Sequence, residues 1–259
     1  MSVLPKHIRE MYYKSKTYGP LGRLLGYAAG YTFMAGVKIL NIKPWQDLAA
    51  LSVVSHQYKF IYIGIPKIAT RSFKDALIDR AEDKSRIEWT EKPGAFREAV
   101  KKYPDYFCFT FVRHPFSRVL SCYNSKIEKP TIGKRARIMS LYEGLHPGMS
   151  FEEFARWLNS EEGRDEIADR HWISQYLYTI DQEGENICDF TGKYERLEQD
   201  WKTICDKTGL PYRPLSQKGW NSAAKSQEHS YDDTTLQNIR TRYATDFELL
   251  NYNKDKLNR

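Results

Sequence analysis

The stretch that decides the fold is residues 58–72, which read YKFIYIGIPKIATRS. Its first part, residues 58–65, is rich in β-branched and aromatic residues, and such a run predicts a buried strand. A short polar loop follows, and residues 72–80 (SFKDALIDR) have the apolar spacing of a helix. A strand, a loop and a helix in this order are typical of α/β proteins.

The alternation of strand and helix continues along the chain. Residues 106–112 (YFCFTFV) and 187–194 (ICDFTGKY) predict two further strands. Connections of this kind favour an α/β fold with a central parallel sheet and helices on both of its faces. The helices that we expect are residues 93–103, 116–127, a helix that Ser150 opens with Glu153 completing a capping box, 197–208 and 232–250.

The composition is that of a folded globular protein. The chain has 259 residues, of which 41% are hydrophobic, with only 15 Gly and 11 Pro, and these values exclude collagen-like, low-complexity and disordered proteins. Its 40 Lys and Arg against 33 Asp and Glu give a net charge of +7, which suits either a polyanionic partner or good solubility. The four cysteines form no CxxC pair, so we expect reduced thiols and no zinc site of that spacing.

The N-terminal part of the chain carries several basic residues and then an uncharged stretch, residues 24–37 (LLGYAAGYTFMAGV). This stretch is shorter than the roughly 20 apolar residues that a membrane-spanning helix needs. We therefore favour a helix that packs on the domain over a helix in the membrane interface or a single-pass anchor. The division that we expect is an N-terminal helical extension, residues 1–55, which can contact a membrane, and a folded domain, residues 56–259.

Two loops have the composition of an anion-binding site. Residues 66–72 (PKIATRS) place basic and hydroxyl side chains between a strand and a helix, where backbone N–H groups also bind anions. Arg113 follows the second strand at an equivalent junction, within residues 111–121 (FVRHPFSRVLS). Ligands of open α/β sheets bind at this edge, so the two loops can hold the two ends of an extended anion. The alternative is two ordinary turns with solvated charges, and the first loop lacks the Walker A pattern GxxxxGK[ST].

At these loops the chain resembles a known family, the carbohydrate sulfotransferases (sulfotransferase family 2), which use 3′-phosphoadenylyl sulfate (PAPS). PKIATRSFK (66–74) is similar to their 5′-phosphosulfate-binding loop, and FVRHPFSRVLSCY (111–123) is similar to their 3′-phosphate-binding segment. The similarity spans residues 56–253 in the order of the family. Three later segments resemble the branch that sulfates chondroitin and dermatan: DRHWISQ (169–175), DFTGKYERLEQD (189–200) and TDFELLNYN (245–253).

The resemblance implies a P-loop-like sulfotransferase fold and a reaction without a metal. The enzyme would move the sulfuryl group of PAPS to a hydroxyl of a polysaccharide, an oligosaccharide or a glycolipid by in-line displacement, and would release PAP. The chain departs from Golgi members at Thr70-Arg71-Ser72 and at His114, and it shows no long Golgi stem. We therefore expect a bacterial-type enzyme of the cytoplasm, which can associate with the inner membrane face through residues 24–37 and has no nucleic-acid partner.

The resemblance also implies roles for single residues. Lys67 would stabilise charge on the departing PAP, and Arg113 with Ser121 would bind its 3′-phosphate. We expect Lys225, in a polar loop, to close over the nucleotide. The 5′-phosphosulfate would be held by Lys67 together with the other residues of the first loop: Pro66, Ile68, Ala69, Thr70, Arg71 and Ser72.

An acceptor hydroxyl needs a base within hydrogen-bonding distance. His171 is the first candidate, because imidazole titrates near neutral pH and because this residue stands in the His-Trp motif. The alternative for His171 is a packing role, and Glu88 and Glu91 are the next candidates for the base. Behind them come His56 and His114, while the side chains that either stack on a sugar ring or pack in the core are Trp89, Trp172 and Trp220.

Two other functions fit parts of the pattern. A nucleotide-binding phosphotransferase would use a similar strand–loop–helix cradle, but it needs Mg²⁺ and the Walker A Ser or Thr. A non-catalytic module that binds polyanions would show clustered Lys and Arg interleaved with aromatic residues. The basic residues are scattered instead, with one small group at Lys134, Arg135 and Arg137. Sulfuryl transfer is therefore the interpretation that we favour.

Overall fold

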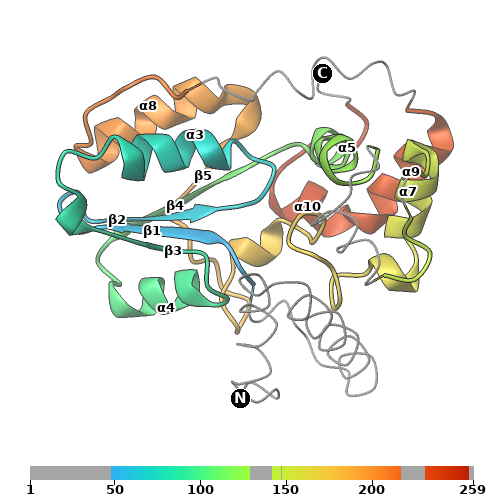
Figure 1. Ribbon diagram of the computed structural model, residues 1–259, viewed down its shortest axis with the longest axis horizontal. Coiled ribbons are helices and arrows are strands. Elements are labelled where there is room, and N and C mark those ends of the chain that lie inside the picture. Colours follow the sequence, from blue (N-terminus) through green and yellow to red (C-terminus); the bar gives the residue numbers. More distant parts are fainter. Residues whose placement is uncertain (1–47, 129–141, 147, 217–230, 257–259) are drawn as a thin grey trace, which may run out of the picture.

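The computed structural model describes residues 48–128, 142–146, 148–216 and 231–256. A five-stranded sheet lies at its centre, with the strand order β3-β1-β2-β4-β5 (Figure 1). Its middle strands are the most apolar, and every residue of β2 is buried. The strands are β1 (Leu51–Ser55), β2 (Phe60–Gly64), β3 (Ile87–Thr90), β4 (Phe107–Val112) and β5 (Phe190–Lys193).

All strands but β1 run in the same direction. β2 pairs with β4, and β4 with β5, in parallel, with Ile61 opposite Cys108 and Phe109 opposite Phe190. β1 is antiparallel to both β2 and β3, so β3 runs with the other three. The predicted α/β fold with a largely parallel sheet is therefore confirmed, and the three predicted strands are β2, β4 and β5.

Two strands of the sheet were not predicted. β1 has the sequence LSVVS, in which serines interrupt the apolar run, yet all its residues are buried because β2 and β3 flank it. β3 (IEWT) is an edge strand whose residues are half-exposed or exposed, so it carries no continuous apolar signal. Because β1 precedes residue 56, the central sheet begins within the segment that was expected to be an N-terminal extension.

Helices cover both faces of the sheet, as predicted. α3 and α8 lie on one face and α4 on the other (Figure 1). The predicted helix 72–80 begins at Thr70 and continues from α3 as a π-helical turn, η2 (Asp75–Asp79). Gly209, with a φ of 73°, ends α8 as predicted. The bounds are α3 (Thr70–Lys74), α4 (Ala95–Lys102) and α8 (Leu197–Thr208).

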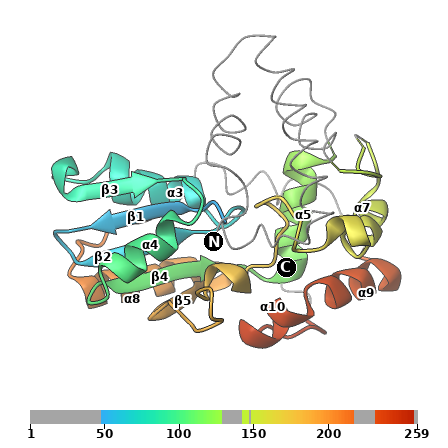
Figure 2. The same cartoon turned by 90° about the horizontal axis from the view of Figure 1, so that it is seen from below.

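A second group of helices stands beside the end of the sheet where β2 and β4 finish (Figures 1 and 2). Ser150 and Glu153 form the predicted capping box at the start of α7. The predicted helix over residues 232–250 is divided at Tyr243 into α9 and α10. These helices are α5 (Pro115–Lys126), α7 (Phe151–Leu158), α9 (Asp233–Arg242) and α10 (Ala244–Leu249), and the short 3₁₀ turns are η3 (Lys84–Arg86), η4 (Glu161–Gly163), η5 (Tyr176–Tyr178) and η6 (Tyr194–Arg196).

Aromatic side chains hold the helices against the sheet. Phe73 of α3 packs on Phe111 of β4 and on Trp201 of α8, with ring centroids 4.7 and 5.6 Å apart. Tyr62 of β2 packs on the Phe73 ring as well, with ring centroids 4.8 Å apart. All these rings are buried, so they fix α3, and with it the loop between β2 and α3, next to the end of β4. The four cysteines are free thiols, and all four are buried.

The predicted membrane contact falls outside the described residues, which begin at Leu48, whereas the uncharged stretch is residues 24–37. In the part of the chain that the structure describes, no helix is both long and apolar enough to cross a membrane. Membrane contact by the N-terminal extension stays a prediction.

Candidate active site

The loop between β2 and α3 has an unusual backbone. Lys67 and Ala69 have φ angles of 77° and 46°, in the left-handed region that residues with a Cβ rarely adopt, whereas Ile68 between them does not. Alternating conformations of this kind direct successive N–H groups into one concavity that binds anions. The Thr70 hydroxyl closes the loop by donating to the Ile65 carbonyl at 3.0 Å. The predicted phosphosulfate-binding loop therefore has a backbone suited to an anion.

The Lys67 side chain reaches across to α5. Its ammonium donates to the Ser125 hydroxyl at 2.6 Å. Burial lowers the pKa of Lys67 to about 8, and the positive charges of Lys126, Arg113 and Arg118 add to this effect. A buried lysine with other cations around it is stabilised in its charged form by an anion. The electrostatics of this loop thus suit an anionic ligand.

Arg113 follows the last residue of β4 and lies against the first loop. Its Nη1 is 3.5 Å from the Lys67 carbonyl oxygen, and its Nε donates to the Ser117 hydroxyl at 3.0 Å. The guanidinium also stacks on the Tyr194 ring, with Cζ 4.3 Å from the ring centroid. The structure therefore brings the two predicted anion-binding loops into direct contact.

One face of α5 joins the two loops. Ser117, Ser121 and Ser125 are spaced by four residues, so they lie in a row along this face. Ser117 bonds to Arg113 and Ser125 bonds to Lys67, so Ser121, the predicted partner of the 3′-phosphate, stands between them. Ser117 and Ser125 were not predicted, although their four-residue spacing from Ser121 was a signal that could have found them.

The candidate base, His171, forms a pair with Asp169, the acidic residue of the same motif, for which no role was predicted. The His171 Nδ1 is hydrogen-bonded to Oδ1 of Asp169, and the same oxygen accepts the His171 backbone N–H at 2.9 Å. Burial lowers the pKa of His171. Burial alone would raise the pKa of Asp169, but its contacts with His171 outweigh this effect and lower it to about 2. An ionised carboxylate only accepts hydrogen bonds, so Nδ1 carries the proton and Nε2 keeps a lone pair.

The His171–Asp169 pair and Lys67 share an electrostatic environment. The positive charge of Lys126, on α5, lowers the pKa of both Lys67 and His171. The buried Cys122 thiol, one turn earlier on α5, is acted on by both Lys67 and Asp169. Both the lysine of the first loop and the candidate base therefore lie within the electrostatic reach of α5.

The other residues of the first loop face different surroundings. The Ser72 hydroxyl donates to the Ser216 carbonyl at 2.6 Å, so this side chain ties α3 to the segment after α8. Ile68 is buried, and only its backbone can therefore meet a ligand. Arg71 is exposed and Pro66 is half-buried. The loop thus offers a ligand its backbone, Lys67 and Arg71, while the Ser72 hydroxyl has a structural bond.

The two glutamates considered as alternative bases lie in different places. Glu88 of β3 bonds to the His56 ring at 2.8 Å, and both belong to the end of the sheet near η3. Glu91, just after β3, pairs with Arg170 at 3.1 Å. Arg170 is the neighbour of His171 in the chain, so Glu91 is the glutamate that lies nearer the candidate base.

For the remaining candidates, the burial of the side chain shows whether it can contact a ligand, except for two residues that lie outside the described part of the chain. His114 and Trp172 are buried, so neither side chain can contact an acceptor sugar, and the ranking of His114 as a third-choice base is wrong for that reason. Trp89 is 48% exposed, and the Lys74 ammonium lies over its ring, 4.4 Å from the centroid. Trp220 and Lys225 lie outside the described residues.

Two of the later motifs, residues 189–200 and 245–253, are hydrogen-bonded to the loop of Arg113 or to each other. Glu195 accepts the His114 backbone N–H at 2.8 Å with one carboxylate oxygen and the Tyr252 hydroxyl at 3.0 Å with the other. Glu195 and Tyr252 come from two of the motifs quoted above, in the segments around β5 and after α10. These motifs therefore meet in space at the backbone next to Arg113.

Residues 51–253 match the sequence profile of the sulfotransferase family. The chain belongs to this family. Among curated sulfotransferases, carbohydrate sulfotransferase 14 of Danio rerio is 27% identical over 248 residues and 83% of this chain, and the Homo sapiens protein of that name is 27% identical over 230 residues and 77% of this chain. Carbohydrate sulfotransferase 11 of Mus musculus is 26% identical over 239 residues, again 77% of this chain. The matched parts cover 66%, 59% and 66% of these relatives' own lengths. No solved structure matches the chain.

Proposed function

We propose that this sulfotransferase moves the sulfuryl group of PAPS to a hydroxyl of a carbohydrate and releases PAP. The observation that carries the proposal is the contact between two cationic loops. Arg113 reaches the Lys67 carbonyl oxygen, and both side chains bond to hydroxyls on one face of α5. Relatives named carbohydrate sulfotransferases match most of the chain, which supports a carbohydrate acceptor. Membership of the family favours this function over a phosphotransferase or a polyanion-binding module.

The residues present fit a donor with two anionic ends. PAPS carries a phosphosulfate on one side of its ribose and a 3′-phosphate on another. The backbone concavity of the Lys67 loop suits the phosphosulfate, and Arg113 with Ser121 suits the 3′-phosphate. The surroundings of the half-buried Lys67 lower its pKa, and a bound anion would stabilise its positive charge. Lys225 remains the residue that we propose to close over the nucleotide.

Lys67 acts on the leaving group. The S–O bond to the 5′-phosphate breaks while the acceptor oxygen bonds to sulfur, and negative charge grows on the 5′-phosphate oxygen. A protonated Lys67 offers this oxygen a charge-assisted hydrogen bond. Ser125, 2.6 Å from the ammonium, holds the lysine side chain in place. Positioning and charge stabilisation of this kind dominate the related transfer of phosphoryl groups.

His171 takes the proton of the acceptor hydroxyl. Because Asp169 holds the Nδ1–H, the lone pair on Nε2 is available to accept that proton. The imidazolium that forms lies beside the ionised Asp169, which stabilises its charge. Glu91, held by Arg170 next to His171, is the second candidate for the base.

Transfer of ³⁵S-labelled sulfate from PAPS to a panel of desulfated polysaccharides tests this proposal. The wild-type protein should label at least one polysaccharide, and Lys67→Ala and Arg113→Ala should each reduce the labelling by roughly 10²-fold or more. Lys84→Ala, at an exposed position in η3, is the matched control and should keep the wild-type rate. Labelling that survives in both loop variants would refute the assignment. Release of phosphate from ATP in the same samples would favour a phosphotransferase.

A further inference from the structure

Gln175 holds the backbone of Arg113 at both of its polar groups. The Gln175 Oε1 accepts the Arg113 N–H at 2.9 Å, and the Gln175 Nε2 donates to the Arg113 carbonyl at 2.8 Å. The Gln175 side chain is fully buried. Arg113 comes directly after β4, whose pairing with β5 ends at Val112. The Gln175 amide therefore bonds to Arg113 as a peptide group of a neighbouring strand would inside the sheet.

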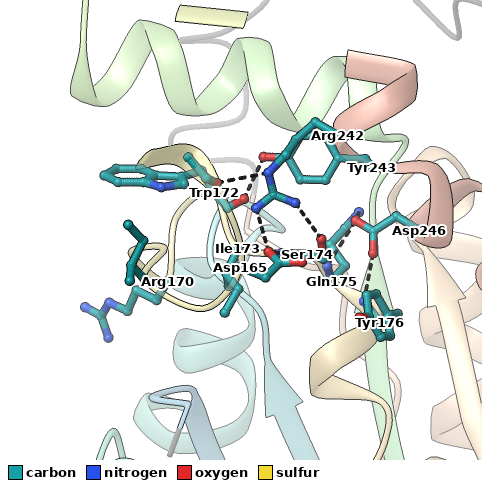
Figure 3. A network of polar contacts seen from close by, with 12 residues as sticks. Asp165, Arg170, Trp172, Ile173, Ser174, Gln175, Tyr176, Arg242, Tyr243 and Asp246 are labelled. Atoms are coloured by element: carbon teal, nitrogen blue, oxygen red, sulfur yellow. Dashed lines mark hydrogen bonds and ion pairs between the residues drawn. The ribbon is translucent and has the colours of Figure 1, made fainter. Parts of the chain in front are cut away.

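Asp246 of α10 holds Gln175 in turn (Figure 3). One carboxylate oxygen accepts the Gln175 backbone N–H at 3.0 Å and lies 3.3 Å from Nε2 of the same residue. The other oxygen accepts the Tyr176 backbone N–H at 2.9 Å. Asp246 is also buried. Because Nε2 faces two acceptors and Oε1 faces an N–H, the orientation of the Gln175 amide is determined by its partners.

An amide is the group that this position requires. A carboxylate at residue 175 would accept the Arg113 N–H, but it would face the Arg113 carbonyl and Asp246 without a hydrogen to donate. An apolar side chain would leave the N–H and the carbonyl of Arg113 without these partners, at a buried place where unmade hydrogen bonds are costly. The backbone of Arg113 would then be free to take other conformations.

The rest of this segment is held by other bonds. The Tyr243 hydroxyl donates to the Trp172 carbonyl at 2.6 Å. Arg242 donates to the Ser174 hydroxyl at 3.1 Å (Figure 3). Removing the Gln175 amide therefore removes the link to Arg113 and leaves these anchors of the segment in place.

We propose that Gln175 is a positioning residue for the donor nucleotide. By holding both polar groups of the Arg113 backbone, it sets the direction in which the Arg113 guanidinium meets the 3′-phosphate. This inference rests on the proposed function, which assigns Arg113 to the 3′-phosphate. Because His171 belongs to the same segment, residues 169–175, one short stretch of chain both carries the base and positions a donor-binding arginine.

Calorimetric titration with two nucleotides tests the inference, because PAP carries a 3′-phosphate and AMP does not. Gln175→Met should weaken PAP binding roughly 5- to 50-fold, since a misdirected Arg113 loses a charge-assisted hydrogen bond. AMP binding should stay within about twofold of wild type, since it makes no such bond. Gln182→Met, at an exposed position, is the matched control and should bind both nucleotides as the wild type does.

If Gln175 had a merely structural role, Gln175→Met would weaken the binding of PAP and of AMP equally, and that result would overturn the inference. A Gln175→Met variant with wild-type PAP affinity would also overturn it. In an Arg113→Ala background, Gln175→Met should cause no further loss of PAP affinity. If Gln175→Met does not fold, Gln175→Asn replaces it. The amide of Asn is too short to reach both polar groups of the Arg113 backbone, so this variant should also bind PAP more weakly and AMP about as the wild type does. A wild-type protein that binds PAP no better than AMP would instead refute the assignment of Arg113, and with it the proposed function.

Discussion

Raising the pH should inactivate the enzyme through Lys67. Burial and the neighbouring cations lower the pKa of Lys67 to about 8 in the free protein. An exposed lysine, with a pKa of about 10.4, is still charged in this range. Since leaving-group stabilisation requires the ammonium, kcat/KM, which reports on the free enzyme, should fall as the pH rises through about 8.

The size of the effect follows from this pKa. The protonated fraction of Lys67 is about 50% at pH 8, about 9% at pH 9 and about 1% at pH 10, so kcat/KM should drop about tenfold per unit above pH 8. In the complex with the donor, the bound anion favours the ammonium and raises the pKa. The limiting rate kcat should therefore persist to higher pH than kcat/KM.

Initial rates of labelled sulfate transfer, measured between pH 6 and 10 at several PAPS concentrations, give both constants. Lys67→Arg is the control, because a guanidinium stays charged up to a pH of about 12. The activity that remains in this variant should show no alkaline decline. A wild-type kcat/KM that stays flat to pH 10, or a decline that is unchanged in Lys67→Arg, would refute this reasoning.

Further predictions concern the same site. His171→Ala should keep PAP binding but lower kcat roughly 10²- to 10⁴-fold, and an unchanged rate would move the role of base to Glu91. Asp169→Asn should lower kcat by a large part of that factor, because an amide can donate to Nδ1 and hold the wrong tautomer; an unchanged kcat would contradict this. Ser121→Ala should weaken PAP binding about tenfold in calorimetry, and an equal loss for AMP would argue against a 3′-phosphate contact. Lys67→Met should raise the free energy of unfolding in urea at pH 7 by about 1 to 3 kcal/mol. The folded protein lowers the pKa of this lysine from about 10.4 to about 8, so the charged side chain that it carries at pH 7 destabilises the fold by about 3 kcal/mol. A less stable variant would contradict this prediction.

The central strands could be predicted because they are buried on both faces. β2 and β4 appear in the sequence as apolar runs between polar segments, and the helices that follow them have regular apolar spacing. β1 could not be found in this way, because serines interrupt its apolar residues and because it joins β2 through a short turn rather than a helix. β3 is an exposed edge strand whose place depends on its pairing with β1.

The candidate site could be predicted only where a residue's type and its loop indicate a role. Lys67 and Arg113 follow apolar strands, and His171 stands in a motif, so each could be named from the sequence. Their partners depend on the tertiary fold. Ser125 lies 58 residues after Lys67, and Gln175 lies 62 residues after Arg113. No periodicity of helix or strand connects positions so far apart, so these contacts appear only when the sheet and α5 are assembled.

Calorimetric titration of the protein with PAP, in the absence of Mg²⁺ and beside ATP, tests the central claim most directly. We predict PAP binding with a Kd on the order of micromolar and much weaker binding of ATP, because PAP alone brings a 3′-phosphate to Arg113 while its 5′-phosphate meets the Lys67 loop. A folded sample that does not bind PAP, or that binds ATP as tightly, would contradict the account.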